Sequence, residues 1–130
     1  MPKMITALVA ATLVFLASPD KAQAAPPGRC PQYEAAIGQV FPKTMVPVFS
    51  RIAYRESRCN PKSVSAVRRT GYPDVGLFQI QGSWRTVTIQ LCRPTGSHIT
   101  ALIRLDCQLR VARYLYDHGG LGHWRASSGQ

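Results

Sequence analysis

Apolar residues recur at the spacing of an α-helix in three stretches of the chain. The first stretch is 31–41, and Pro42 ends it because proline cannot continue a helix. An apolar stripe of this kind is typical of a helix that packs against a core. We therefore expect a helix here whose buried face consists of Tyr33, Ala36, Ile37, Val40 and Phe41.

The second stretch predicts a helix that carries Glu56 in its last turn. Pro47 suits the first turn of such a helix, where a missing N–H costs little. Asn60-Pro61 marks the end of the helix, because proline disfavours helical geometry in the residue before it. The apolar positions of this helix are Val48, Phe49, Ile52 and Ala53.

The third stretch, 107–118, predicts a longer helix that ends before Gly119-Gly120. Asp106 has the right side chain and position to cap its N-terminus. A short helical turn is expected just before it, at 100–105. The apolar face of the long helix consists of Val111, Ala112, Leu115 and Tyr116.

The segments between these helices carry weaker signals. Residues 62–70 form a polar, basic connection that ends in the turn residues Gly71-Tyr72-Pro73. Residues 85–91 fit a helix or a strand equally well. The chain contains no evident internal repeat. These patterns predict one small, mainly α domain, with an α+β arrangement as the alternative.

The first 24 residues have the layout of a secretory signal peptide. Lys3 precedes an apolar run at 5–17, and the small residues 22–24 precede the expected cleavage after Ala24. The run is too short for a comfortable membrane span, although a retained N-terminal anchor is the alternative. We expect a secreted or periplasmic protein, with residues 25–130 as its domain and no stable membrane insertion after cleavage.

The four cysteines form an even set, which is typical of disulfides in a small secreted domain. Four cysteines allow three pairings. We favour Cys30–Cys59, which would tie the N-terminal segment to the Glu56 helix, and Cys92–Cys107, which would close the loop before the last helix. A zinc site that includes His98 is the alternative, but its spacing matches no usual pattern of paired ligands. No metal or cofactor is therefore expected.

The chain is strongly basic, with a formal net charge of +10. Loss of the leader removes Lys3, Lys21 and Asp20, so the mature charge is +9. Such a surface attracts polyanions, and for an exported protein the cell envelope supplies them. Nucleic acid is not expected as a partner, because the chain has no basic run with interleaved aromatic residues and no nucleic-acid-binding motif.

Glu56 has the setting of a catalytic acid. A carboxylate in the last turn faces the negative end of the helix dipole, which disfavours its ionised form and raises its pKa. The segment 74–80 would add apolar surface that removes water from the carboxyl, and the Gln79 amide could bond a substrate. An acid with a raised pKa suits proton transfer near neutral pH. The structural alternative is a solvated glutamate paired with a neighbouring arginine.

Four short motifs surround this glutamate: Ile52-Ala53, Glu56-Ser57, Asn60-Pro61 and Gly76-Leu77-Phe78-Gln79-Ile80. In this order and spacing they resemble the first two motifs of the soluble lytic transglycosylases, a family of the lysozyme-like superfamily. The resemblance implies a small lysozyme-like domain with a cleft between the Glu56 helix and residues 72–84. It implies cleavage of peptidoglycan glycan strands at the β-1,4 bond between N-acetylmuramic acid and N-acetylglucosamine. Glu56 would be the only acid and base, and Ser57 and Gln79 would support substrate binding.

The resemblance weakens toward the C-terminus. The third family motif, Ala-Tyr-Asn-Ala-Gly, has no clean counterpart, and Leu115-Tyr116-Asp117 is the nearest segment. Tyr116 is thus a candidate substrate-binding residue, with packing on a helix face as the alternative. The end of the chain is similar to smaller transglycosylases of secretion and conjugation systems, which implies a possible envelope or secretion-apparatus partner. We expect a monomer.

Two further residues have alternative interpretations. Trp84 would be a platform for sugar rings or part of the core. Asp74 would be a second catalytic carboxylate, as in c-type lysozymes, or a turn residue paired with Arg68 or Arg69. The first case gives a two-carboxylate hydrolase. A third possibility, from another class, is a non-catalytic cationic protein that binds cell walls or acts as an antimicrobial.

Overall fold

The computed structural model describes residues 28–129, which form a mainly helical domain with one two-stranded sheet. The strands pair antiparallel, with Asp74 opposite Gln81 and Val75 opposite Ile80. The proposed leader, 1–24, lies outside the described residues. The elements, with short 3₁₀ helices labelled η, are α2 (Pro31–Val40), η1 (Lys43–Met45), α3 (Val46–Ser57), β1 (Asp74–Val75), β2 (Ile80–Gln81), η2 (Gly82–Trp84), α4 (Arg85–Cys92), α5 (His98–Leu102), α6 (Leu105–Gly119) and η3 (Gly122–Trp124).

The core is organised around Phe49 in α3, which is fully buried. Its ring stacks on Phe41, at a centroid distance of 3.9 Å, and meets three other rings edge-on. Those rings belong to Phe78 of residues 74–80, which we call the return segment, to Tyr116 of α6 and to Trp124 of η3. Phe49 therefore joins parts of the chain that lie far apart in sequence.

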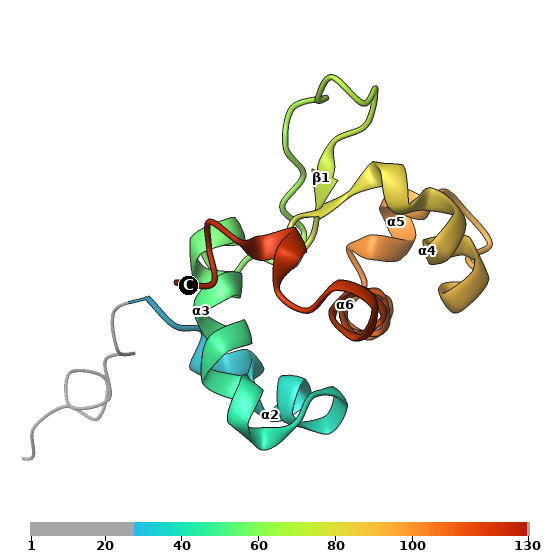
Figure 1. The fold of residues 1–130 in the computed structure, drawn as a ribbon. Coiled ribbons are helices and arrows are strands. Elements are labelled where there is room, and N and C mark those ends of the chain that lie inside the picture. Colours follow the sequence, from blue (N-terminus) through green and yellow to red (C-terminus); the bar gives the residue numbers. More distant parts are fainter. Residues whose placement is uncertain (1–27, 130) are drawn as a thin grey trace, which may run out of the picture.

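The longest helix, α6, packs on the core opposite α3. It packs against α2, α4, α5 and η3, and Figure 1 shows it viewed almost end-on beside α3. Its buried face includes Val111, Ala112 and Leu115, as its apolar spacing predicts. Among the helices of 28–129, none combines the length and the apolar character that a membrane span needs.

Some helix boundaries differ from the sequence predictions. Helix α3 ends at Ser57, before Asn60-Pro61, because Arg58 and Cys59 adopt left-handed backbone conformations with φ of 53° and 65°. The Arg58 N–H then bonds the Tyr54 carbonyl and closes the helix. The ambiguous segment 85–91 belongs to helix α4.

The prediction that Asp106 caps the last helix is wrong. Helix α6 begins at Leu105, and its N-cap is Arg104, whose side chain forms no capping bond. Leu105 packs against the core, so the helix starts before the aspartate. Asp106 lies in the first turn and pairs with Arg104 at 2.8 Å. A carboxylate there still interacts favourably with the helix dipole.

Both expected disulfides are confirmed. They are Cys30–Cys59 and Cys92–Cys107, with Cα–Cα distances of 5.6 and 5.5 Å. No cysteine remains for the zinc site considered with His98, whose ring instead packs edge-on against Tyr72 at 5.5 Å. The first disulfide fixes the turn that follows α3, and the second joins the end of α4 to the start of α6.

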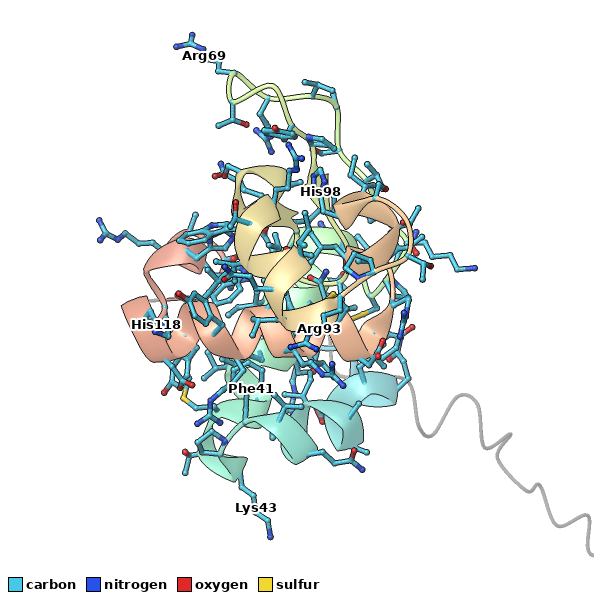
Figure 2. All side chains as sticks on the ribbon, turned by 90° about the vertical axis from the view of Figure 1, so that its right-hand side faces the viewer. Phe41, Lys43, Arg69, Arg93, His98 and His118 are labelled. Atoms are coloured by element: carbon cyan, nitrogen blue, oxygen red, sulfur yellow. A yellow bond between two sulfur atoms is a disulfide. The ribbon has the colours of Figure 1, made fainter. Side chains whose placement is uncertain are left out.

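Residues 62–73 form a projecting loop, which we call the arm. It extends beyond the helices in Figure 1, and Arg69 lies at its tip in Figure 2. Its base is held by backbone bonds, from the Gly76 N–H to the Ser63 carbonyl at 2.7 Å and from the Ser65 N–H to the Asp74 carbonyl at 2.9 Å. Toward the tip, the side chain of Val67 is 68% exposed. The arm is thus anchored at one end and open at the other.

Candidate active site

Glu56 lies in the last turn of α3, as predicted, and its side chain is half-buried. Burial raises the pKa of its carboxyl, and the negative charge of Asp74 raises this pKa further. A hydrogen bond with the Ser127 side chain and the positive charge of Arg68 act in the opposite direction, but the net direction is upward. Glu56 is therefore biased toward its protonated form.

The Glu56 carboxyl faces a pocket of about 380 Å³. The pocket lies where the end of α3, the arm, the sheet and η3 meet. Its lining is polar and charged, so it suits a hydrophilic ligand. The lining residues are Glu56, Arg68, Asp74, Gln79, Gln81 and His123.

The return segment packs closely against α5 and α6 at Gly76, and this packing holds it beside Glu56. The φ of Gly76 is +86°, and an added Cβ would lie 2.6 Å from the Leu102 carbonyl oxygen and even closer to the Gln108 side chain. Gln108 is buried and donates from Nε2 to the Val75 carbonyl at 3.2 Å. Its Oε1 accepts the Phe78 N–H at 3.0 Å. A glycine at this position lets α6 hold the return segment through one amide.

Ser57 holds the return segment from the opposite side. Its Oγ lies 2.7 Å from the Leu77 carbonyl and 2.9 Å from the Ala53 carbonyl, and only 8% of the residue is exposed. These contacts tie the end of α3 to the return segment. Ser57 therefore supports the site through the backbone.

Gln79 lines the Glu56 pocket, but its amide nitrogen is engaged within the protein. Nε2 lies 3.0 Å from the carbonyl oxygens of Ser63 and Gly76. The residue has a φ of 50°, in the left-handed region. A ligand would consequently donate its hydrogen bond to the Gln79 amide oxygen.

Asp74 pairs with an arginine and also lies in the Glu56 pocket. Its Oδ2 pairs with Arg68 at 2.9 Å, which matches the structural interpretation. The residue also lines the Glu56 pocket, and its Oδ1 is buried with no hydrogen-bond partner. The structure thus brings the second carboxylate to the site and gives it a cationic partner.

Trp84 and Tyr116 have different surroundings. Trp84 is 36% exposed and lines an adjoining pocket of about 240 Å³, which we call the Trp84 pocket. Tyr116 packs edge-on against Phe41 and Phe49, with centroids 5.8 and 5.7 Å away. It lines neither pocket, so its position matches the packing alternative. The residues around the Trp84 pocket are Trp84, Leu115, His118, Gly119, Gly122 and His123.

The C-terminal segment supplies two site residues that the sequence analysis missed, His123 and Ser127. Figure 1 shows this segment passing beside α3, where the Arg55 side chain donates to the Ser127 carbonyl at 3.2 Å. The buried Trp124 anchors the segment, because its Nε1 donates to the Phe78 carbonyl at 2.9 Å. In the sequence, only Trp124 shortly after Gly119-Gly120 indicated that this segment could return to the core.

Within 28–129, no group of three or more His, Cys, Asp or Glu side chains is arranged to hold a metal ion. Comparison with known proteins found no family model and no curated protein that matches the chain. The arrangement around Glu56 can nevertheless be described chemically: a half-buried acid beside a second carboxylate, an amide and an imidazole.

Proposed function

We propose that this protein cleaves peptidoglycan as a lytic transglycosylase with a lysozyme-like fold. One observation carries the proposal: Glu56 combines a raised pKa with access to a polar pocket beside the return segment. A carboxyl group whose pKa is raised holds its proton to higher pH, and one that is also open to a hydrophilic ligand can act as a general acid. The resemblance of the motifs around Glu56 and Gln79 supports the glycan strand as the substrate.

Glu56 would first donate its proton to the glycosidic oxygen as the bond to the muramyl C1 breaks. The resulting carboxylate would then accept the proton of the muramyl 6-hydroxyl, whose oxygen bonds to C1. The product is a 1,6-anhydromuramyl end, and Glu56 recovers its proton. This cycle uses one carboxylate and needs no cofactor.

A second candidate, a two-carboxylate lysozyme, is supported by the position of Asp74. The Asp74 side chain lines the same pocket as Glu56 and has an unpartnered buried oxygen, which could face a developing positive charge at C1. The ion pair with Arg68 favours the single-carboxylate mechanism, because it already uses one oxygen of this side chain.

The setting supports the envelope as the place of action. Two disulfides are typical of proteins outside the cytoplasm, and the positive net charge suits an anionic wall. We propose a secreted or periplasmic monomer that acts on peptidoglycan, with an envelope or secretion apparatus as a possible partner.

The test is the digestion of purified peptidoglycan by wild-type protein and by Glu56→Gln, followed by mass spectrometry of the products. We expect 1,6-anhydromuramyl ends from the wild type and a loss of at least about 100-fold in turnover for the variant, which cannot deliver a proton. Glu34→Gln is the matched control, because Glu34 is the only other glutamate and pairs with Arg29 outside the pocket. It should retain wild-type turnover.

The same assay separates the alternatives. Reducing muramic acid ends, together with a collapse of activity in Asp74→Asn, would establish the two-carboxylate hydrolase. Binding of wild-type protein to walls without any cleavage would establish the non-catalytic class. Substantial turnover by folded Glu56→Gln protein would assign the acid role to another residue.

A further inference from the structure

His123 lies at the junction of two pockets. It is the one residue shared by the lining of the Glu56 pocket and the lining of the Trp84 pocket. The first pocket is polar, whereas Trp84 and Leu115 give the second an apolar wall. A ligand that filled both pockets would therefore lie against His123 in each.

The position of this ring is fixed by its neighbours. Trp124 is only 2% exposed, and its indole N–H holds the Phe78 carbonyl at 2.9 Å. The His123 ring contacts the Trp124 ring edge-on, with centroids 4.9 Å apart. Both His123 and Gln79 also line the Glu56 pocket. These contacts attach His123 to the return segment that faces Glu56.

His123 is uncharged near neutral pH. Burial lowers the pKa of its imidazole, and this effect exceeds the opposing effects of the Gln79 backbone and the Asp74 charge. A neutral imidazole has one donor nitrogen and one acceptor nitrogen. The acceptor nitrogen can take a hydrogen bond from a ligand that donates.

We infer that His123 is a positioning residue that accepts a hydrogen bond from the glycan where the strand passes from the Glu56 pocket to the Trp84 pocket. The inference rests on the proposed function and adds the contact that sets the strand's register. N-acetylated sugars carry suitable donors, in their hydroxyl and amide N–H groups, and apolar ring faces that suit Trp84. The sugar unit at the junction would be held by both features at once.

This role makes glycan binding sensitive to acid. When His123 gains a proton, both ring nitrogens become donors and the acceptor is lost. The other charged or titratable groups around the ring are Glu56, Asp74 and Arg68 in one pocket and His118 in the other. Any pH dependence must therefore be assigned by substitution of each titratable group.

The experiment measures binding without turnover. Peptide-free glycan strands of peptidoglycan are titrated against the Glu56→Gln protein between pH 4 and pH 8. We expect His123→Phe to weaken binding at pH 7 roughly two- to tenfold, the effect of one neutral hydrogen bond. His123→Gln keeps an acceptor and should bind within about twofold of its parent at that pH.

The pH profiles give the decisive comparison. Binding by the Glu56→Gln parent should weaken as the pH falls and His123 becomes charged, whereas His123→Gln should lack this dependence. His118→Gln, added to the same parent, should keep it. Asp74→Asn should keep it with the midpoint moved to lower pH, because the Asp74 charge raises the pKa of His123. If His123→Phe fails to fold, the comparison between the parent and His123→Gln remains a complete test.

Two results would overturn the inference: unchanged affinity in folded His123→Phe, or an acid-dependent loss of affinity that persists in His123→Gln. Absence of glycan binding by the parent at every pH would overturn the proposed function together with this inference. Turnover by the single Glu56→Gln variant would contradict the proposed mechanism while the binding measurement still decided the role of His123.

Discussion

The two sides of the Glu56 pocket are held in place by different means. On the return side, Ser57, Gln108 and Trp124 bond three successive backbone groups of the return segment. These groups are the Leu77 carbonyl, the Phe78 N–H and the Phe78 carbonyl. On the arm side, backbone bonds hold the base of 62–73, and the tip is exposed. The return side therefore fixes the proposed acid, whereas the arm contributes charge through Arg68. Substitutions on the two sides should change different properties.

The largest effect is expected on the return side, from loss of Cys30–Cys59. Replacing both cysteines by serine should lower the free energy of unfolding by about 3.6 kcal/mol on the chain-entropy model, and loss of Cys92–Cys107 by about 3 kcal/mol. The two bonds span 29 and 15 residues. Chemical denaturation of each double variant measures both losses.

Activity distinguishes these disulfides more sharply than stability. Cys30–Cys59 fixes the left-handed turn at Arg58 and Cys59, just after α3, whereas Cys92–Cys107 lies at the start of α6. At a temperature where both variants are folded, only loss of the first bond should lower turnover per folded molecule. Equal turnover in the two variants would show that the turn does not depend on its disulfide.

An intermediate effect is expected from Trp124→Phe. The change removes the N–H that holds the Phe78 carbonyl and leaves a buried acceptor unpaired, at a cost of about 1–3 kcal/mol. The chain's other tryptophan, Trp84, is the matched control, because Trp84→Phe alters a partly exposed ring and should change stability by at most about 0.5 kcal/mol. Thermal melts of the two variants give the comparison, and equal shifts would contradict it.

The smallest effect on stability is expected on the arm, from Arg68→Gln. Its pair with Asp74 is largely exposed on the arginine side, so the loss should be about 0–1 kcal/mol. The pH profile should nevertheless change. Arg68 lowers the pKa of Glu56, so its removal raises that pKa further. Glu56 then keeps its proton to higher pH. The pH at which activity falls on the alkaline side should therefore be higher than in the wild type.

Arg69→Gln is the control for this shift, because Arg69 lies at the tip of the same arm and makes no ion pair with Asp74. Its activity profile should match that of the wild type. A downward shift in Arg68→Gln, or equal shifts in both variants, would contradict the assignment of Arg68 as the cation that acts on Glu56.

Much of the helical fold could be predicted from local patterns. Helices α2, α3 and α6 have apolar stripes, and prolines lie near the starts of α2 and α3. Helix α4 could not be assigned, because its threonine, valine and isoleucine residues suit a strand as well. Its helical state depends on packing against α5 and α6, which no local pattern contains.

Site residues that lie in or beside the sequence motifs could be predicted. A site residue that is distant in sequence and reaches the pocket only through the fold could not. Glu56 and Gln79 belong to the motifs, Asp74 lies two residues before Gly76, and all three line one pocket. His123 reaches the same pocket from η3, far along the sequence, because Trp124 bonds the Phe78 carbonyl. That contact depends on tertiary structure. The sequence alone also could not decide whether Tyr116 contacts a ligand or packs in the core. Its contacts with Phe41 and Phe49 decide this, and they are set by tertiary structure.

The order of the disulfides has a consequence for production of the protein. In both bonds the partners are consecutive cysteines, Cys30 with Cys59 and Cys92 with Cys107. A chain threaded N-terminus first into an oxidising compartment presents each partner next in turn, so oxidation in order of arrival forms both native bonds. A host with a thiol oxidase and no disulfide isomerase should therefore yield correctly paired protein.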